Sequence, residues 1–222
     1  MIETGIQFGN IHSFYDLNLI LSGLEIPPAM PKFNYIDIPG SDGSVDITEA
    51  TGEVRFADRD GCKFTFTMNP ADDLSESAWE EKKTEVSNCL NGVLFKKITL
   101  DKDPDFYYSG RCAVSEYLSD KRVRNIVVTA TLKPYKFKQT ETVIKFDLSA
   151  TPKDVIVMNS RKSVCPLIEC TANNTVIGFG TSTFNLGAGN HKILDIRLTE
   201  GINHLKLSGT GSVTFRFQEG EL

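Results

Sequence analysis

The sequence has few histidines and no cysteine spacing that is typical of a metal site. The chain has three histidines, one tryptophan and five cysteines among 222 residues. The cysteines form no CxxC pair and are odd in number, so neither a zinc site nor a disulfide framework is indicated. We expect free thiols, buried in strands for Cys62, Cys112 and Cys170, and lying in a helix for Cys89.

The sequence also lacks long apolar runs and an excess of positive charge. No segment approaches the roughly 20 apolar residues that cross a membrane, and Met1–Gly5 lacks the start of a secretory signal. The formal net charge is -5, which argues against nucleic acid as the main partner. We expect a protein made in a cytoplasm, with no membrane partner.

Short motifs that carry enzyme chemistry are absent. The sequence has no GxSxG, GxxxxGK[ST] or HExxH pattern, and its segments 178–180 and 187–189 do not extend to GxGxxG. Residues 101–105 resemble the start of a calcium loop, but Phe106 stands where an EF-hand needs glycine and Cys112 where it needs glutamate. We therefore expect no catalytic residue, no cofactor and no metal site.

Two other groups of charged residues are better explained as parts of turns than as binding sites. Asp42 and Asp46 surround a glycine turn, where aspartates usually accept hydrogen bonds from nearby backbone amides instead of holding a metal. The basic residues Lys121, Arg122 and Arg124 are too few for a nucleic-acid surface, and a solvated turn is the favoured interpretation.

One strong helix is predicted in the first half of the chain. The candidates for its N-cap are Asp72, Asp73, Ser75 and Ser77, and Ser77 with Glu80 has capping-box spacing. Apolar residues then recur at helical spacing: Trp79, Val86, Cys89, Leu90, Val93 and Leu94. We expect Trp79 to anchor the helix on a sheet and Asn91–Gly92 to end it.

Strand-like runs of alternating or β-branched residues lie on both sides of this helix. They are 35–38, 52–56, 63–68, 97–100, 107–114 and 124–132. Strands, one helix and further strands indicate an α+β domain with the helix on one face of a mostly antiparallel sheet. We expect this N-terminal domain to span residues 1–147.

Helix signals end near Val143, and the rest of the chain has short strand-like runs separated by glycine turns. These runs are 143–148, 167–170, 194–198, 204–207 and 213–217. Their regular spacing predicts a small β-sandwich over 148–222, with Ser149–Pro152 as the linker. The fold class is therefore mainly β with one prominent helix.

The most distinctive segment is Tyr35–Ile47, in which Pro-Gly and Asp-Gly pairs join two alternating apolar runs. Pro39 presets one backbone angle, while Gly40 and Gly43 accept the positive φ that other residues resist. The segment predicts a β-hairpin with one fixed conformation.

Four features follow one another along nearly the whole chain. They are YIDIPG at 35–40 with Asp42-Gly43, the acidic helix with its tryptophan, DPDFYYSGR at 103–111, and EGINHLKL at 200–207 followed by Gly209. In this order they resemble the distal tail proteins (Dit) of long-tailed, non-contractile bacteriophages. The closing segment is typical of a galectin-like or carbohydrate-binding-module-like sandwich.

The resemblance implies a structural virion component, encoded by a phage or prophage. In that family the N-terminal domains form a homo-hexameric ring that continues the tail tube, and the sandwich decorates its outside as a hub for the tail tip or baseplate. The implied partners are other copies of the chain, the tail tube protein and the tail-associated hub or tip protein. The resemblance leaves open whether the rings also stack on one another. DNA would only pass through the channel, as cargo.

Some family members also hold receptor-binding proteins through an arm of the sandwich. This sequence departs from that pattern, because a sandwich of minimal size leaves no room for a long inserted arm. A closed ring needs the same two complementary surfaces on every copy, and a rigid hairpin can supply one of them. We therefore expect an interface at the hairpin turn, formed by Ile38, Pro39, Gly40, Asp42 and Gly43.

The alternative function is lectin-like recognition of a cell-wall carbohydrate by the sandwich. Sugar sites usually stack aromatic rings on sugar faces. Phe215 and Phe217 alternate within a predicted strand and are expected in the core. Phe179 and Phe184 then remain as loop aromatics and are the candidate sugar contacts.

Overall fold

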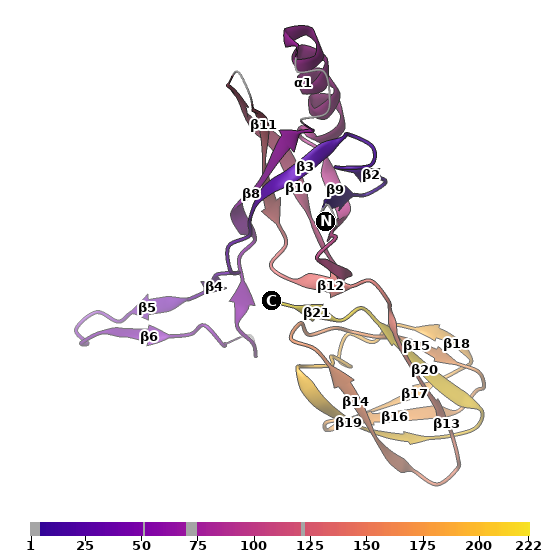
Figure 1. Ribbon diagram of the computed structural model, residues 1–222. Helices are drawn as coiled ribbons and strands as arrows, with labels where there is room; N and C mark the ends of the chain where they lie inside the picture. Colours follow the sequence, from indigo (N-terminus) through magenta and orange to yellow (C-terminus); the bar gives the residue numbers. More distant parts are fainter. Residues whose placement is uncertain (1–4, 51, 70–74, 121–122) are drawn as a thin grey trace. The chain divides into compact units, whose positions relative to one another are not determined.

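The computed structural model describes residues 5–50, 52–69, 75–120 and 123–222. The chain divides into two compact units, Met1–Lys136 and Phe137–Leu222 (Figure 1). Each unit has its own hydrophobic core.

The division falls earlier in the chain than the boundary expected between residues 147 and 148. The reason is that β13 (Thr142–Asp147) pairs along its whole length with β20 (Ser212–Phe217) and so belongs to the second unit. The segment Ser149–Pro152, expected as an interdomain linker, instead connects β13 to β14 (Lys153–Asn159) within that unit.

Among the described residues of the first unit, seven strands form an antiparallel sheet in the order β2-β1-β9-β10-β11-β8-β3. Their bounds are β1 (Ile6–Phe8), β2 (Ile11–His12), β3 (Leu19–Glu25), β8 (Arg59–Met68), β9 (Leu94–Leu100), β10 (Asp103–Ser119) and β11 (Arg124–Leu132). The predicted strands at 63–68, 97–100, 107–114 and 124–132 are confirmed as parts of β8 to β11.

The predicted helix is α1 (Glu76–Leu90), and Ser75 is its N-cap because the Ser75 hydroxyl accepts a hydrogen bond from the Ala78 amide at 3.3 Å. The predicted capping box is wrong, because Ser77 lies inside the first turn. Asp72 and Asp73 lie outside the described residues. Among the described residues, no helix is long and apolar enough to reach across a lipid bilayer.

One face of α1 packs on the sheet, as the helical spacing predicted. Trp79, Val86 and Leu90 are buried in the first core. The helix ends at Asn91, and Leu94 is 58% exposed because it already belongs to β9.

Phenylalanines form the centre of this core. The ring of Phe8 lies 6.0 Å from that of Phe64, 6.2 Å from that of Phe66 and 5.5 Å from that of Phe95, measured between centroids. Phe64 and Phe66 are both fully buried, which confirms that they face the same side of β8. Strand β1 is thereby anchored in the first core.

An arm is inserted between β3 and β8, two strands that pair with each other. Its base is the pair β4 (Pro31–Lys32) and β7 (Arg55–Phe56), so only the end of the predicted 52–56 strand is extended. Beyond the base lies the hairpin of β5 (Tyr35–Asp37) and β6 (Ser44–Asp46), which projects from the first unit in Figure 1.

Arg59 fixes the root of this arm. Its side chain is buried and donates hydrogen bonds to the carbonyls of Pro27, at 2.7 Å, and Pro134, at 2.9 Å. Its guanidinium also lies 5.9 Å from the ring centroid of Tyr108. The arm therefore leaves the sheet from a well-defined point.

The second unit is a β-sandwich, as predicted, with sheets β13-β20-β15-β18 and β14-β19-β16-β17. The remaining bounds are β12 (Lys136–Lys138), β15 (Leu167–Cys170), β16 (Thr175–Phe179), β17 (Ser182–Leu186), β18 (Gly189–His191), β19 (Gly201–Ser208) and β21 (Gly220–Glu221). The strand predicted at 194–198 is wrong. That segment is a loop whose Ile196 and Leu198 are buried in the core, which explains its strand-like pattern.

The cysteines occupy the predicted positions. Cys62, Cys112 and Cys170 are buried in β8, β10 and β15, and Cys89 is half-buried in α1. Burial raises the pKa of the Cys112 thiol to about 12. This thiol acts as a small apolar side chain and not as a nucleophile.

Glu219 closes the end of the sandwich. Its carboxylate accepts hydrogen bonds from the hydroxyls of Thr142, at 2.5 Å, and Ser160, and pairs with the Lys138 ammonium at 2.9 Å. Burial raises the pKa of Glu219, but these hydrogen bonds together outweigh burial and hold the pKa below its ordinary value.

A carboxyl group with a lowered folded-state pKa stabilises the fold above its unfolded pKa, about 4.3 for glutamate, and this contribution is lost as pH falls through the folded value. We expect Glu219→Gln to destabilise the second unit by about 1 to 3 kcal/mol at pH 7. The variant should also lose less stability than the parent between pH 6 and pH 3, as measured by urea denaturation. Asp154→Asn, at a carboxylate 80% exposed, is the control. Equal losses on acidification in variant and parent would contradict the assignment.

Candidate interaction site

The hairpin at the end of the arm has the geometry that its sequence predicts. Tyr35 pairs with Asp46, Ile36 with Val45 and Asp37 with Ser44. Gly40 and Gly43 have φ values of 82° and 73°, in the left-handed region that other residues rarely adopt. A side chain at either position would meet no atom within 4 Å, so the turn selects glycine through backbone strain and not through crowding.

Two acids of the hairpin, Asp37 and Asp46, accept hydrogen bonds from residues of the hairpin or next to it. Asp46 accepts a hydrogen bond from the Thr48 amide at 2.8 Å, and Asp37 accepts one from the Ser44 hydroxyl at 2.6 Å. Hydrogen bonds from Thr48 lower the pKa of Asp46. This confirms the backbone-bonding interpretation of Asp46. No group of three His, Cys, Asp or Glu that could hold a metal occurs among the described residues.

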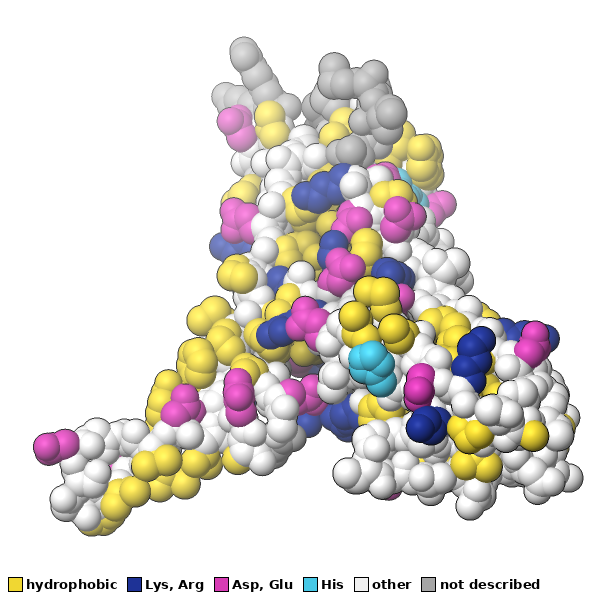
Figure 2. All heavy atoms as spheres, turned by 90° about the horizontal axis from the view of Figure 1, so that it is seen from below, with side chains coloured by type: hydrophobic (Ala, Val, Ile, Leu, Met, Phe, Trp, Pro, Cys, Tyr) yellow, Lys and Arg dark blue, Asp and Glu magenta, His cyan; other side chains and the backbone are white. Residues whose placement is uncertain are grey.

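One face of the hairpin is apolar and bare. Residues directly opposite in an antiparallel pair share a face, so Ile36 and Val45 lie on one face, with Ile38 and Ile47 at the next alternate positions. They are 50%, 46%, 47% and 37% exposed, respectively. None of them belongs to either hydrophobic core. Figure 2 shows hydrophobic and acidic side chains along the projecting arm at the lower left.

The predicted interface residues all lie at the exposed turn of this hairpin: Ile38, Pro39, Gly40, Asp42 and Gly43. Of these, Ile38 also belongs to the apolar face. The sequence prediction missed the other three aliphatic residues of that face, Ile36, Val45 and Ile47, although their alternation between Tyr35 and Ile47 was the available signal.

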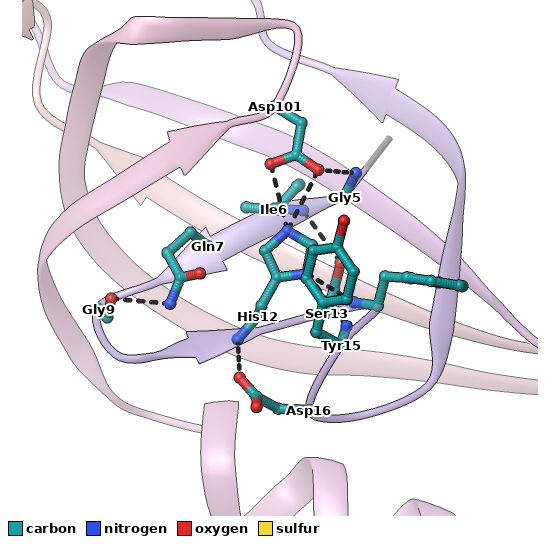
Figure 3. A network of polar contacts seen from close by, with 10 residues as sticks. Gly5, Ile6, Gln7, Gly9, His12, Ser13, Tyr15, Asp16 and Asp101 are labelled. Carbon is teal, nitrogen blue, oxygen red and sulfur yellow. Dashed lines mark hydrogen bonds and ion pairs between the residues drawn. The ribbon is translucent and has the colours of Figure 1, made fainter. Parts of the chain in front are cut away.

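A cluster around His12 and Asp101 is the part of the first unit that most resembles catalytic chemistry (Figure 3). His12 Nδ1 accepts hydrogen bonds from the amides of Phe14 and Tyr15 at 3.1 and 3.2 Å. The hydrogen of the ring is therefore on Nε2, which donates to Asp101 at 3.2 Å. Asp101 also accepts from the Gly5 amide at 2.7 Å.

This cluster is a structural lock and not a catalytic triad. Ser13 follows His12 in the chain, but its hydroxyl accepts a hydrogen bond from the Ile6 amide at 3.0 Å. His12 is 6% exposed, and its Nδ1 already accepts two amides, so no lone pair is left to remove a proton from a nucleophile. The contacts fasten β1 to the end of β9.

Asp101→Ala should destabilise the first unit by about 1 to 3 kcal/mol, because the Gly5 amide and His12 Nε2 lose their acceptor. Asp101→Asn, which keeps one acceptor oxygen, should lose less. Urea denaturation followed by circular dichroism measures the difference, with Lys102→Ala at the next, exposed position as control. If Asp101→Ala has the same urea midpoint as the parent, the hydrogen bonds to Asp101 do not stabilise the first unit.

The acidic segment that resembled a calcium loop is also accounted for. Asp101 belongs to the lock, and Asp103 forms an ion pair with Lys136 at 3.0 Å. The two carboxylates therefore have different partners.

The predicted basic turn is described only at Arg124. The Arg124 guanidinium pairs with Glu76 at 3.2 Å and lies 5.5 Å from the ring centroid of Trp79, whereas Lys121 and Arg122 lie outside the described residues.

A hollow of about 540 Å³ lies on the face of the sheet turned away from the first core. Small side chains line it, among them Gly61, Ala113 and Thr129. Ala113 and Thr129 are directly opposite each other on β10 and β11. The alternate residues of the same strands, such as Cys112 and Val128, point into the core.

The rim of the hollow is mostly basic. It carries Arg111 and Lys133 against the single carboxylate of Asp58, which lies 2.9 Å from the Lys133 ammonium. Arg111 is exposed and donates a hydrogen bond to the Gly92 carbonyl at 2.5 Å. Nothing in the sequence alone indicated this hollow.

No protein-family model and no curated protein matches this sequence. Among solved structures, the Dit protein of phage SPP1, described as a paradigm of the hub adsorption apparatus in phages that infect Gram-positive bacteria, matches with a TM-score of 0.69. The two share 15% sequence identity, and the match covers 99% of each chain. The chain has the fold of a phage distal tail protein. This confirms the fold predicted from its sequence features.

Within this Dit fold, the candidate sugar contacts are not loop residues. Phe179 ends β16 and Phe184 lies in β17, and both side chains pack against the core of the sandwich. The placement of these residues in loops is therefore wrong, because the short strands β16 and β17 carry only a weak signal in the sequence. Rings that are half-buried against the core offer less surface to a sugar than exposed loop aromatics would.

Proposed function

We propose that this protein forms a hexameric ring at the distal end of a phage tail tube and acts there as the hub between the tube and the tail tip or baseplate. The first unit forms the ring and binds the tail tube protein on one side and the tail-associated hub protein on the other. Stacked rings are a variant of the same assembly. The protein is then a virion component, and DNA passes through the ring as cargo.

The observation that carries this proposal is the bare apolar face of the hairpin in a chain with the Dit fold. An isolated two-stranded hairpin is marginally stable in water, and a soluble monomer rarely leaves aligned aliphatic side chains exposed. Because Ile36, Ile38, Val45 and Ile47 pack in neither core, a surface outside the chain must cover them. In a ring, each hairpin finds that surface on another molecule.

The test is the oligomeric state of the full chain. Multi-angle light scattering and negative-stain microscopy should show six-fold rings, either for the protein alone or after addition of the tail tube protein. A strictly monomeric protein at high concentration, with and without the tube protein, would overturn the proposal.

The rigidity of the turn gives a second expected result. Pro39→Ala with Gly43→Ala removes the preset angle of one residue and strains the backbone of the other, where φ is 73°. We expect ring assembly and joining to the tail tube to weaken, while the circular dichroism spectrum stays that of the parent. If assembly and joining remain intact, the hairpin is only a turn.

A further inference from the structure

The first unit has one projecting surface and one concave surface. The hairpin presents a narrow ribbon with aliphatic side chains on one face. The hollow on the sheet is concave, and its floor of glycine, alanine and threonine leaves room for another backbone to approach. The floor is open at Gly61, where an added Cβ would meet no atom within 4 Å.

The two surfaces also differ in charge. Residues 33–49 contain Asp37, Asp42, Asp46 and Glu49 and no lysine or arginine. The rim of the hollow carries Arg111 and Lys133 against one aspartate, Asp58. Opposite potentials on two surfaces steer association and fix its register. The net charge of the whole chain is -5, so a mostly basic hollow stands out as a place for an acidic hairpin.

The hairpin of one molecule does not fill its own hollow, because Arg59 fixes the root of the arm and the hairpin projects from the unit (Figure 1). A ribbon that must dock on a different copy makes a heterologous interface, and heterologous interfaces that close form rings. We infer that the apolar face of each hairpin seats in the β10–β11 hollow of the next copy, with Asp42 of the hairpin turn toward Arg111 and Lys133. This inference rests on the ring proposed above and names its interface.

Disulfide trapping tests the pairing in the full chain. In a background where the two half-buried cysteines are replaced, Cys89→Ser and Cys165→Ser, the substitutions Ile38→Cys and Ala113→Cys place one thiol on the ribbon and one on the hollow floor. Mild oxidation should give a ladder of covalent oligomers on a non-reducing gel. Each single variant should give no ladder, because one thiol per copy has no partner in a head-to-tail ring.

The control pair keeps Ile38→Cys and moves the second thiol to Tyr15→Cys, at a site 78% exposed and outside the hollow. Two results would contradict the proposed docking without contradicting the ring. In the first, rings assemble but Ile38→Cys with Ala113→Cys gives no ladder. In the second, the control pair gives an equal ladder. Failure of the unsubstituted protein to form any ring is a different result, and it counts against the proposed function itself.

Charge reversal provides an independent measurement. Arg111→Glu should raise the concentration needed for assembly about tenfold, and adding Asp42→Lys should recover part of that loss, since the pair then has opposite charges again. Arg111 is exposed and lies outside the core, so the fold should be unchanged by circular dichroism. An Arg111→Glu protein that assembles at the same concentration as the parent overturns the inference.

Discussion

Ile36→Ser combined with Val45→Ser is expected to abolish ring assembly at concentrations where the parent is fully assembled. The two side chains face each other across the hairpin pair and are 50% and 46% exposed. Burying each in an interface contributes about 1.5 kcal/mol, so their loss costs about 3 kcal/mol, or about 100-fold in affinity, at every interface of the proposed ring. Because each copy carries the same defect, the whole ring fails.

The fold should survive this double substitution, because neither side chain belongs to a core. Light scattering measures the loss of rings, and thermal unfolding should show a midpoint close to that of the parent. The matched control is Ile156→Ser with Met158→Ser, which removes two aliphatic side chains that are 52% and 64% exposed on the sandwich. If both double variants assemble less well to the same extent, general loss of apolar surface and not the hairpin face explains the result.

The hairpin could be predicted because all its determinants are local. Pro39, Gly40 and Gly43 fix the turn within a few residues, and the alternation on either side fixes the pairing. The same holds for α1, whose apolar spacing and N-terminal serines lie within one segment. Where two local signals competed, at Ser75 and Ser77, only the three-dimensional course of the chain decided which serine caps the helix.

The hollow could not be predicted, because it depends on register between strands far apart in the sequence. Ala113 and Thr129 become neighbours only when β10 and β11 pair, and Gly61 joins them only through β8. The unit boundary escaped prediction for a similar reason. Nothing near Thr142–Asp147 reveals that its partner is β20 at the end of the chain, so a loop within the sandwich resembled a linker.

Trp79→Ala is expected to destabilise the first unit by about 3 to 5 kcal/mol. Trp79 is 2% exposed and joins α1 to the sheet. Its ring packs edge-on against Tyr117 at 6.1 Å, and the Arg124 guanidinium lies 5.5 Å from its centroid. Truncation would leave a large cavity and remove these contacts together, whereas Trp79→Phe, which keeps an aromatic ring, should lose about half as much.

Urea denaturation followed by circular dichroism measures this effect, since Trp79 is the sole tryptophan and its fluorescence is lost in the variants. Glu81→Ala, on the exposed side of the same helix, should stay within about 0.5 kcal/mol of the parent. A similarly small change in Trp79→Ala would mean that α1 is not needed to hold the sheet. Below its unfolding transition, Trp79→Ala should still form rings, because it leaves the hairpin untouched. Ile36→Ser with Val45→Ser should instead stay folded and fail to assemble. These opposite outcomes separate the residues that stabilise the fold from those proposed to join copies of the chain.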